Sequence, residues 1–160
     1  MARLIILTGR VHTGKTTALQ KLIAQHPKRF AGTLAPVIDQ QRYLRNISTG
    51  EQRCLERPLS QDDALPVGPY VFSRAVFDWA RQQLSEQIEL YPDRWLVIDE
   101  LGKLELKGQG LAPTALEIVK NNRSPQLIVV VRDSLVDQVL RRLGAQQPLM
   151  IGKEDLGTLM

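Results

Sequence analysis

The chain has 160 residues, of which 24% are charged, and its formal net charge at pH 7 is +4. This length fits one domain with one core, and the ordinary balance of apolar and charged residues excludes a disordered chain or a repeat array. Lys and Arg are dispersed, and the chain holds only two Trp, three Tyr and three Phe. Nucleic-acid binding is therefore not expected, because such surfaces cluster basic residues around stacking aromatics.

Membrane insertion is also not expected. No segment approaches the roughly 20 apolar residues that span a bilayer, and the apolar run at residues 4–7 is too short for a signal peptide. Cys54 is the single cysteine, so an internal disulfide or a cysteine metal cluster cannot form. We expect a soluble, cytoplasmic protein with one domain over residues 1–160.

The first half of the chain predicts a buried strand, a helix and a hairpin. The strand covers residues 4–7 and the helix extends to about Gln25, before Pro27. Residues 32–57 alternate around Thr49-Gly50, which is typical of an antiparallel hairpin. The hairpin face is marked by Tyr43, Arg45 and Ile47 and then by Gln52, Cys54 and Glu56. A return loop is predicted at Pro66, Gly68 and Pro69.

The second half alternates helices with buried strands. Ser73 is a candidate N-cap for a helix that carries Val76, Ala80, Leu84 and Ile88 on one face. Strands are predicted at residues 96–98 and 127–131, with a short helix starting near Pro113 between them. A last helix begins at Asp133 or Ser134 and ends at Gly144. Continuously apolar strands between helices predict an α/β fold with a mostly parallel sheet, helices on both faces and an inserted antiparallel hairpin.

A phosphate-binding loop is predicted between the first strand and the first helix. The pattern G-x-x-x-x-G-K-[ST] is matched by Gly9-Arg10-Val11-His12-Thr13-Gly14-Lys15-Thr16. In such a loop Gly14 lets backbone N–H groups approach the phosphates, and Lys15 reaches the β- and γ-phosphates. Thr16 is the expected hydroxyl ligand of Mg²⁺, and Thr17 is placed to contact the α-phosphate. These residues predict a site for a nucleoside triphosphate.

A second acidic signal follows the strand at residues 96–98. Asp99 and Glu100 stand at its carboxyl end, the edge at which such sheets bind ligands. Asp99 is the candidate carboxylate ligand of Mg²⁺, directly or through water. Side chains alternate along a strand, so Glu100 points elsewhere and is the candidate base that activates the attacking water.

The chain resembles the small P-loop nucleoside triphosphatases of the THEP type, also called cancer-related nucleoside-triphosphatases. The resemblance covers most of the chain and is carried by Gly9 to Thr17, Ser48-Thr49-Gly50-Glu51, Val67-Gly68-Pro69-Tyr70 and the run Val97-Ile98-Asp99-Glu100-Leu101-Gly102-Lys103-Leu104-Glu105-Leu106. It implies a RecA-like P-loop core and slow hydrolysis of several nucleoside triphosphates. It also implies that the turn with Leu101, Gly102 and Lys103 contacts the nucleotide.

The loop departs from this family at Val11-His12, where Pro-Gly is common. His12 is a further candidate phosphate contact, against the commoner solvent-facing loop histidine. A cation on the γ-phosphate assists hydrolysis of this kind. Arg132 and Lys103 are the internal candidates, whereas Arg42, Arg45, Arg53 and Arg57 are expected to be solvated.

Two other functions share these motifs. A nucleotide or small-molecule kinase needs an acceptor pocket and an arginine-bearing lid, and the lid-like stretch at residues 107–110 has no arginine. A nucleotide-switched binding module needs little turnover and a partner surface. No Asn-Lys-x-Asp guanine-reading motif occurs, so the base preference stays open, as do a protein partner and an oligomer.

Overall fold

The computed structural model describes residues 3–121, 126–145 and 147–160. The strands are β1 (Arg3–Gly9), β2 (Phe30–Leu34), β3 (Val37–Ile38), β4 (Gln41–Asn46), β5 (Gln52–Cys54), β6 (Ala64–Val67), β7 (Tyr70–Ser73), β8 (Trp95–Ile98), β9 (Gln126–Arg132) and β10 (Leu149–Ile151). The α-helices are α1 (Lys15–Gln25), α2 (Arg74–Leu90), α3 (Lys103–Leu106), α4 (Ala112–Asn121) and α5 (Val136–Leu143). Single-turn 3₁₀ segments occupy η1 (Pro27–Arg29) and η2 (Asp133–Leu135), and a longer one occupies η3 (Lys153–Leu159).

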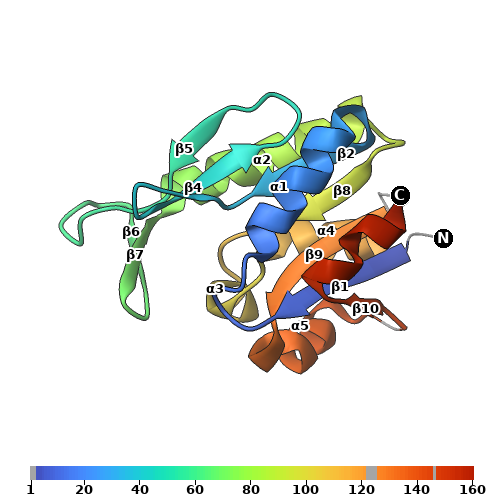
Figure 1. Cartoon of the computed structure of the whole chain (residues 1–160). Helices are drawn as coiled ribbons and strands as arrows, with labels where there is room; N and C mark the ends of the chain where they lie inside the picture. The colour runs from blue at the N-terminus through green and yellow to red at the C-terminus, as the bar shows by residue number, and fades with distance from the viewer. Residues whose placement is uncertain (1–2, 122–125, 146) are drawn as a thin grey trace.

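The main sheet is parallel in its centre and antiparallel at one end (Figure 1). Its strand order is β10-β1-β9-β8-β2-β4-β3, and β5 pairs with β4. The five strands from β10 to β2 run parallel, whereas β4 pairs antiparallel with its neighbours. β9 therefore separates β1, which leads into the phosphate loop, from β8, which ends before Asp99. The predicted hairpin at residues 32–57 is present as β4 and β5, with Tyr43 opposite Cys54.

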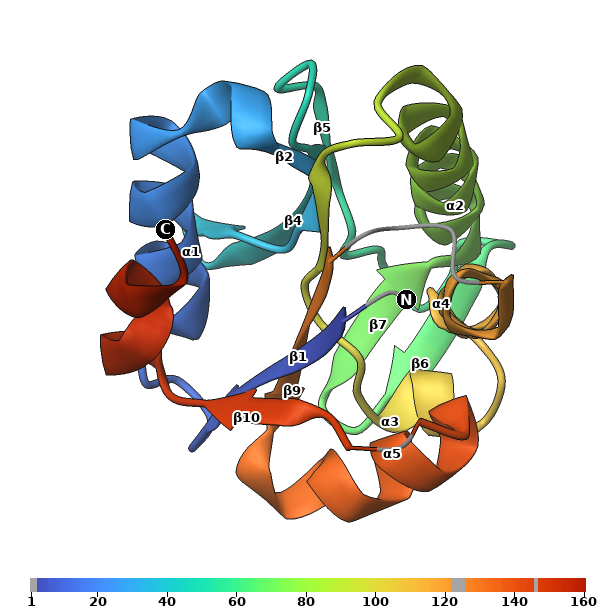
Figure 2. The same ribbon diagram turned by 90° about the vertical axis from the view of Figure 1, so that its right-hand side faces the viewer.

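Helices cover both faces of this sheet (Figure 2), as the continuously apolar strands predict. Ile5 and Leu7 of β1 pack with Leu19 of α1 and Leu156 of η3 in one apolar cluster. Ile6, which points to the other face, belongs to a second cluster built from α2, α3, α4 and α5. Full burial of one such side chain stabilises the fold by about 1.5–3 kcal/mol, so both helix layers are held by the sheet. Within the described residues, no helix has the length and apolar character that would cross a membrane.

Several strands lie outside the sequence prediction, and β2 and β10 show two reasons for this. β2 carries Ala31-Gly32-Thr33 in place of a large apolar run, because β8 approaches closely there. A Cβ at Gly32 would lie 2.0 Å from the Val97 carbonyl oxygen, and its φ is +120°. β10 has only three residues and follows Pro148, so it is too short to give a periodic signal.

The predicted return loop at Pro66, Gly68 and Pro69 was wrong in part. Pro66 lies inside β6, and Gly68-Pro69 form the turn between β6 and β7. This second hairpin makes a sheet of its own and projects from the body of the molecule (Figure 1). Turn-forming residues thus marked a hairpin tip, which local composition does not distinguish from a plain loop.

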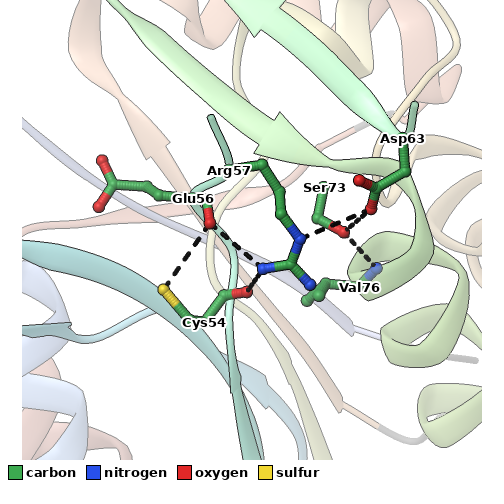
Figure 3. Close-up of polar contacts among 6 residues, drawn as sticks. All are labelled: Cys54, Glu56, Arg57, Asp63, Ser73 and Val76. Atoms are coloured by element: carbon green, nitrogen blue, oxygen red, sulfur yellow. Dashed lines mark hydrogen bonds and ion pairs between the residues drawn. The ribbon is translucent and has the colours of Figure 1, made fainter. Parts of the chain in front are cut away.

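Polar contacts fix the base of the β6–β7 hairpin (Figure 3). Arg57 donates hydrogen bonds to the carbonyl oxygens of Cys54 and Glu56 at 3.2 and 3.3 Å, and its Nε lies 3.8 Å from Asp63 Oδ2. Ser73 Oγ donates to Asp63 and accepts from the Val76 N–H at 3.1 Å. Ser73 is thus the predicted N-cap of α2. The same side chain joins the hairpin to the helix.

Candidate nucleotide site

The predicted phosphate loop lies between β1 and α1, as expected. Gly14 is the N-cap of α1 with φ +86°, a conformation that favours glycine. His12 also has a positive φ of 59°, so the sequence departure from Pro-Gly places a histidine where glycine is sterically easier. Thr13 Oγ1 donates to the Arg10 carbonyl oxygen at 2.7 Å and braces the loop. His12 itself is exposed.

Lys15 is buried beneath this loop, with an exposed fraction of 7%. Its Nζ donates to the carbonyl oxygens of Gly9 at 3.2 Å and Arg10 at 2.8 Å. Burial lowers the pKa of Lys15, while the neighbouring carboxylates of Glu100 and Asp99 raise it. The ammonium group is therefore positioned inside the loop and faces the acidic end of β8.

Asp99 connects the phosphate loop to the end of β2. Its Oδ2 accepts hydrogen bonds from Thr16 Oγ1 at 2.8 Å and from the Ala35 N–H at 3.1 Å. Its Oδ1 is buried without a hydrogen-bond partner among the described residues. Burial raises the pKa of Asp99 to about 6, although the hydrogen bonds from Ala35 and Thr16 and the charge of Arg42 lower it. An oxygen left unpaired in the interior is costly unless another group uses it.

Glu100 and Arg132 come together from neighbouring strand ends. Glu100 lies just after β8, and Arg132 is the last residue of β9. Arg132 Nη2 lies 4.0 Å from Glu100 Oε1. Both side chains keep about a third of their surface exposed, 29% for Arg132 and 34% for Glu100. The peptide bond between Asp99 and Glu100 is cis. A carboxylate and a guanidinium thus stand at the same edge of the sheet as Lys15.

The turn after Glu100 is organised by a buried carboxyl group. Glu105 accepts hydrogen bonds from the N–H of Gly102 at 2.8 Å and of Leu111 at 2.9 Å, which closes the segment around α3. Burial raises the pKa of Glu105 to about 7. A Cβ at Gly110, where φ is +62°, would lie 1.8 Å from Glu105 Oε2. The lid-like stretch of the sequence is therefore a fixed turn around Glu105.

These groups face one cavity of about 750 Å³. Most of the predicted site residues line it, namely Val11, His12, Thr13, Gly14, Lys15, Thr16, Thr17, Asp99, Glu100, Gly102, Lys103 and Arg132. Gly9 and Arg10 lie beside it and hold Lys15 through their carbonyl oxygens. The side chain of Leu101 is 2% exposed and packs in the core on the α2 face, away from the cavity. In the described residues no group of three His, Cys, Asp or Glu side chains forms a metal cluster.

Three residues at this site were missed by the sequence reasoning. Arg42 was expected to be solvated, but it lines the cavity and donates from Nη1 to the Ala35 carbonyl oxygen at 2.7 Å. The sequence pattern could have predicted this position of Arg42. Arg42 is two residues from the buried Leu44, so both side chains lie on the same face of β4. Lys153 lies in η3, and its Nζ donates a hydrogen bond to the Thr13 carbonyl oxygen. Neither Lys153 nor Glu105 had a sequence pattern that assigned it a role.

The fold and these contacts define a P-loop nucleoside triphosphatase. A phosphate loop joins β1 to α1, and the acidic end of β8 reaches it across the width of β9. The family model described as NTPase matches residues 4–153, and the chain belongs to this NTPase family.

Comparison with solved structures supports the same fold. The chain is similar to the crystal structure of THEP1 from the hyperthermophile Aquifex aeolicus, with a TM-score of 0.73. The match covers 99% of this chain and 94% of that chain at 18% sequence identity. No curated protein sequence matched the chain. The predicted resemblance to the THEP type and the predicted fold class are confirmed.

Proposed function

We propose that this nucleoside triphosphatase hydrolyses ATP, GTP and other nucleoside triphosphates to the diphosphate and phosphate, and that it requires Mg²⁺. The observation that carries the proposal is the Thr16–Asp99 contact at 2.8 Å. It joins the hydroxyl of the phosphate loop to the carboxylate of β8, which are the two protein ligands that P-loop enzymes provide for the metal.

The donor set fits Mg²⁺. Thr16 Oγ1 and Asp99 are oxygen donors, and Asp99 Oδ1 has no hydrogen-bond partner among the described residues. Mg²⁺ prefers one or two carboxylates together with phosphate oxygens and waters. P-loop families generally use a divalent metal. When bound, the ion would neutralise charge on the β- and γ-phosphate oxygens.

Lys15 and the backbone of residues 11–17 would hold the triphosphate. The helix N-terminus at Gly14 adds unpaired N–H groups and a partial positive charge. The Lys15 ammonium group, placed between the loop and the acidic strand end, would neutralise the charge that develops on the leaving diphosphate oxygen.

Glu100 would accept the proton of the attacking water. The water oxygen bonds to the γ-phosphorus, the bond to the β,γ-bridging oxygen breaks, and the released proton moves to the Glu100 carboxylate. Arg132 lies 4.0 Å from Glu100, so its guanidinium would orient that carboxylate and face the transferred phosphoryl group. A cation in this place is worth about 10³–10⁵ in turnover in related chemistry.

Broad base tolerance follows from which part of the nucleotide the site would contact. The residues named above address phosphates, a metal and water, and the phosphate cradle is the same for every base. Lys103 and His12 line the same cavity and would contact the nucleotide without a purine-specific hydrogen-bond pattern.

The experiment that tests the proposal measures phosphate release from a panel of nucleoside triphosphates with Mg²⁺ and with EDTA. We expect turnover of ATP and GTP within tenfold of each other and loss of turnover in EDTA. Lys15→Ala removes the buried ammonium group, while Lys21→Ala on the exposed side of α1 is the matched control. Phosphate release that survives EDTA, or that the Lys15 variant retains, would contradict the proposal.

A further inference from the structure

The cavity extends well beyond the phosphate loop. One part is polar and holds Lys15, Asp99 and Glu100. The other part, which we call the apolar compartment, is lined by Leu44, Leu55, Phe72, Phe77 and Leu111. A volume of about 750 Å³ for the two parts together lies in the upper part of the range of about 300–1,000 Å³ that small-molecule pockets occupy.

The apolar compartment is assembled from segments far apart in the chain. Leu44 comes from β4, Phe72 from the β6–β7 hairpin and Phe77 from α2. Phe72 and Phe77 meet edge to face, with ring centroids 6.2 Å apart and planes at 72°. Tyr70 stacks on Phe72 from the hairpin tip at 5.7 Å. An aromatic wall of this kind suits the flat face of a ring.

A guanidinium group without an ion pair among the described residues faces this compartment. It belongs to Arg42, whose backbone N–H donates to Glu56 Oε2 at 2.9 Å and whose charge lowers the pKa of Asp99. Arg42 donates from one guanidinium nitrogen to the Ala35 carbonyl oxygen, and no described carboxylate forms an ion pair with it. A guanidinium group has five N–H donors, so most remain for a ligand. A half-buried cation beside apolar walls gains strongly from an anionic partner.

The compartment begins at the γ-phosphate end of the site. Asp99 Oδ2 bonds Thr16 on one side and the Ala35 N–H on the other, and Arg42 bonds the same Ala35 residue through its carbonyl oxygen. Ala35 thus links Arg42 to Asp99, the proposed carboxylate ligand of the metal. In a nucleotide whose γ-phosphate lies beside Asp99, the base would lie at the opposite end of the triphosphate, away from this space.

Apolar side chains also gather at the mouth of the cavity. Val11 is 42% exposed, Val37 56% and Tyr70 43%, and all three line the cavity. They come from the phosphate loop, β3 and the hairpin tip. The base of the hairpin is held by the Arg57, Asp63 and Ser73 contacts of Figure 3, which fixes the wall that carries Phe72.

We propose that the apolar compartment binds a second small molecule, which has a ring-sized apolar body and a carboxylate, sulfonate or phosphate group that pairs with Arg42. This proposal rests on the assignment of the phosphate loop as the triphosphate site, because that assignment fixes which end of the cavity is free. The second ligand would lie next to the γ-phosphate, where it would exclude bulk water and change the rate of phosphate release.

Two fluorescent probes with the same body test the proposal. The anionic probe is 1-anilinonaphthalene-8-sulfonate, and the neutral probe is N-phenyl-1-naphthylamine, which lacks the sulfonate. Each is titrated into the folded protein with Mg²⁺ and saturating inorganic triphosphate. We expect one binding site per chain for each probe, with tighter binding of the anionic one.

Two substitutions separate the apolar and charged contacts. Arg42→Gln should lower the affinity for the anionic probe on the order of tenfold, because one charge-assisted hydrogen bond is lost. The affinity for the neutral probe should stay within about twofold of the parent value. Val67→Trp, which fills the compartment from β6, should weaken both probes. Leu59→Ser, at an exposed apolar residue outside the cavity with 69% of its surface accessible, is the control and should change neither.

Three results would overturn the proposal. One is unchanged binding of the anionic probe by the Arg42 variant, and another is equal weakening of both probes by that variant. The third is loss of probe binding when saturating ATP replaces the inorganic triphosphate, which would assign the compartment to the base of the nucleotide. Circular dichroism of each variant checks its fold. If the Val67 variant does not fold, the Arg42 variant with the two probes still decides. Loss of triphosphate binding in Lys15→Ala with retained probe binding separates the two sites.

Discussion

Glu105 offers a test of the site architecture through protein stability. Its carboxyl group is buried and accepts two backbone N–H bonds, from Gly102 and Leu111. Burial raises its pKa from 4.5 to about 7. Between these values the folded protein keeps a proton on Glu105 that the unfolded chain has released. The free energy of unfolding therefore falls as pH rises through this window.

The size of this effect follows from the two pKa values. At about 1.4 kcal/mol per pH unit, the stability linked to Glu105 amounts to roughly 3 kcal/mol. It is fully present below about pH 4.5 and is lost as pH rises through about 7. Glu105→Gln does not titrate, but Gln has one acceptor oxygen, so one amide loses its partner at a cost of about 1–3 kcal/mol. The variant should be less stable than the parent at pH 5, and the difference should vanish or change sign by pH 8.

Urea unfolding at intervals from pH 4.5 to 8 measures this difference, with the fluorescence of Trp79 and Trp95 as the signal. Asp99, whose pKa is raised to about 6 by burial, acts in the same direction but is common to both proteins and cancels in the difference. Glu86→Gln, at an exposed carboxylate of α2, is the control and should give a small, constant change. A difference between parent and Glu105 variant that stays constant across this range would refute the reasoning.

Other substitutions test separate parts of the account. Lys15→Ala should abolish tight triphosphate binding in calorimetric titration with an unchanged circular dichroism spectrum; retained affinity would refute the phosphate-loop assignment. Asp99→Asn should raise the Mg²⁺ concentration for half-maximal turnover, since it weakens one oxygen ligand, and an unchanged Mg²⁺ profile would count against it. Gly110→Ala should destabilise the fold by several kcal/mol in urea unfolding, because its Cβ would lie 1.8 Å from Glu105 Oε2; a loss below about 0.5 kcal/mol would show that the turn relaxes. Ser73→Ala should cost about 0.5–2 kcal/mol by removing the N-cap of α2, and equal stability of the two proteins would argue against the cap.

The central elements could be predicted from the sequence because their signals are local. The α2 helix was predicted from Ser73 and from apolar residues at helical spacing, and the structure gives Arg74–Leu90 with Ser73 as N-cap. The β4–β5 hairpin was predicted from alternation around Thr49-Gly50. Helix periodicity, caps and turn residues act over a few positions, so one sequence contains them.

The missed elements depend on contacts between distant segments. β2 is a strand because β8 pairs with it. Gly32 stands in β2 because β8 lies too close for a side chain there, and not because glycine favours a strand conformation. Arg42 lines the cavity because β4 joins the sheet beside β2, which brings it to the Ala35 carbonyl oxygen. Such placements follow from the strand order, which the sequence pattern alone did not supply.

The central claim is that Glu100 activates the water that attacks the γ-phosphate. Single-turnover phosphate release by Glu100→Gln, measured beside the binding of triphosphate and Mg²⁺ and beside the exposed Glu86→Gln control, tests it most directly. We expect binding to stay within about twofold while the rate of phosphate release falls by roughly 10² to 10⁴, the loss typical of a general base. A rate within a fewfold of the parent protein, with binding intact, would contradict the claim.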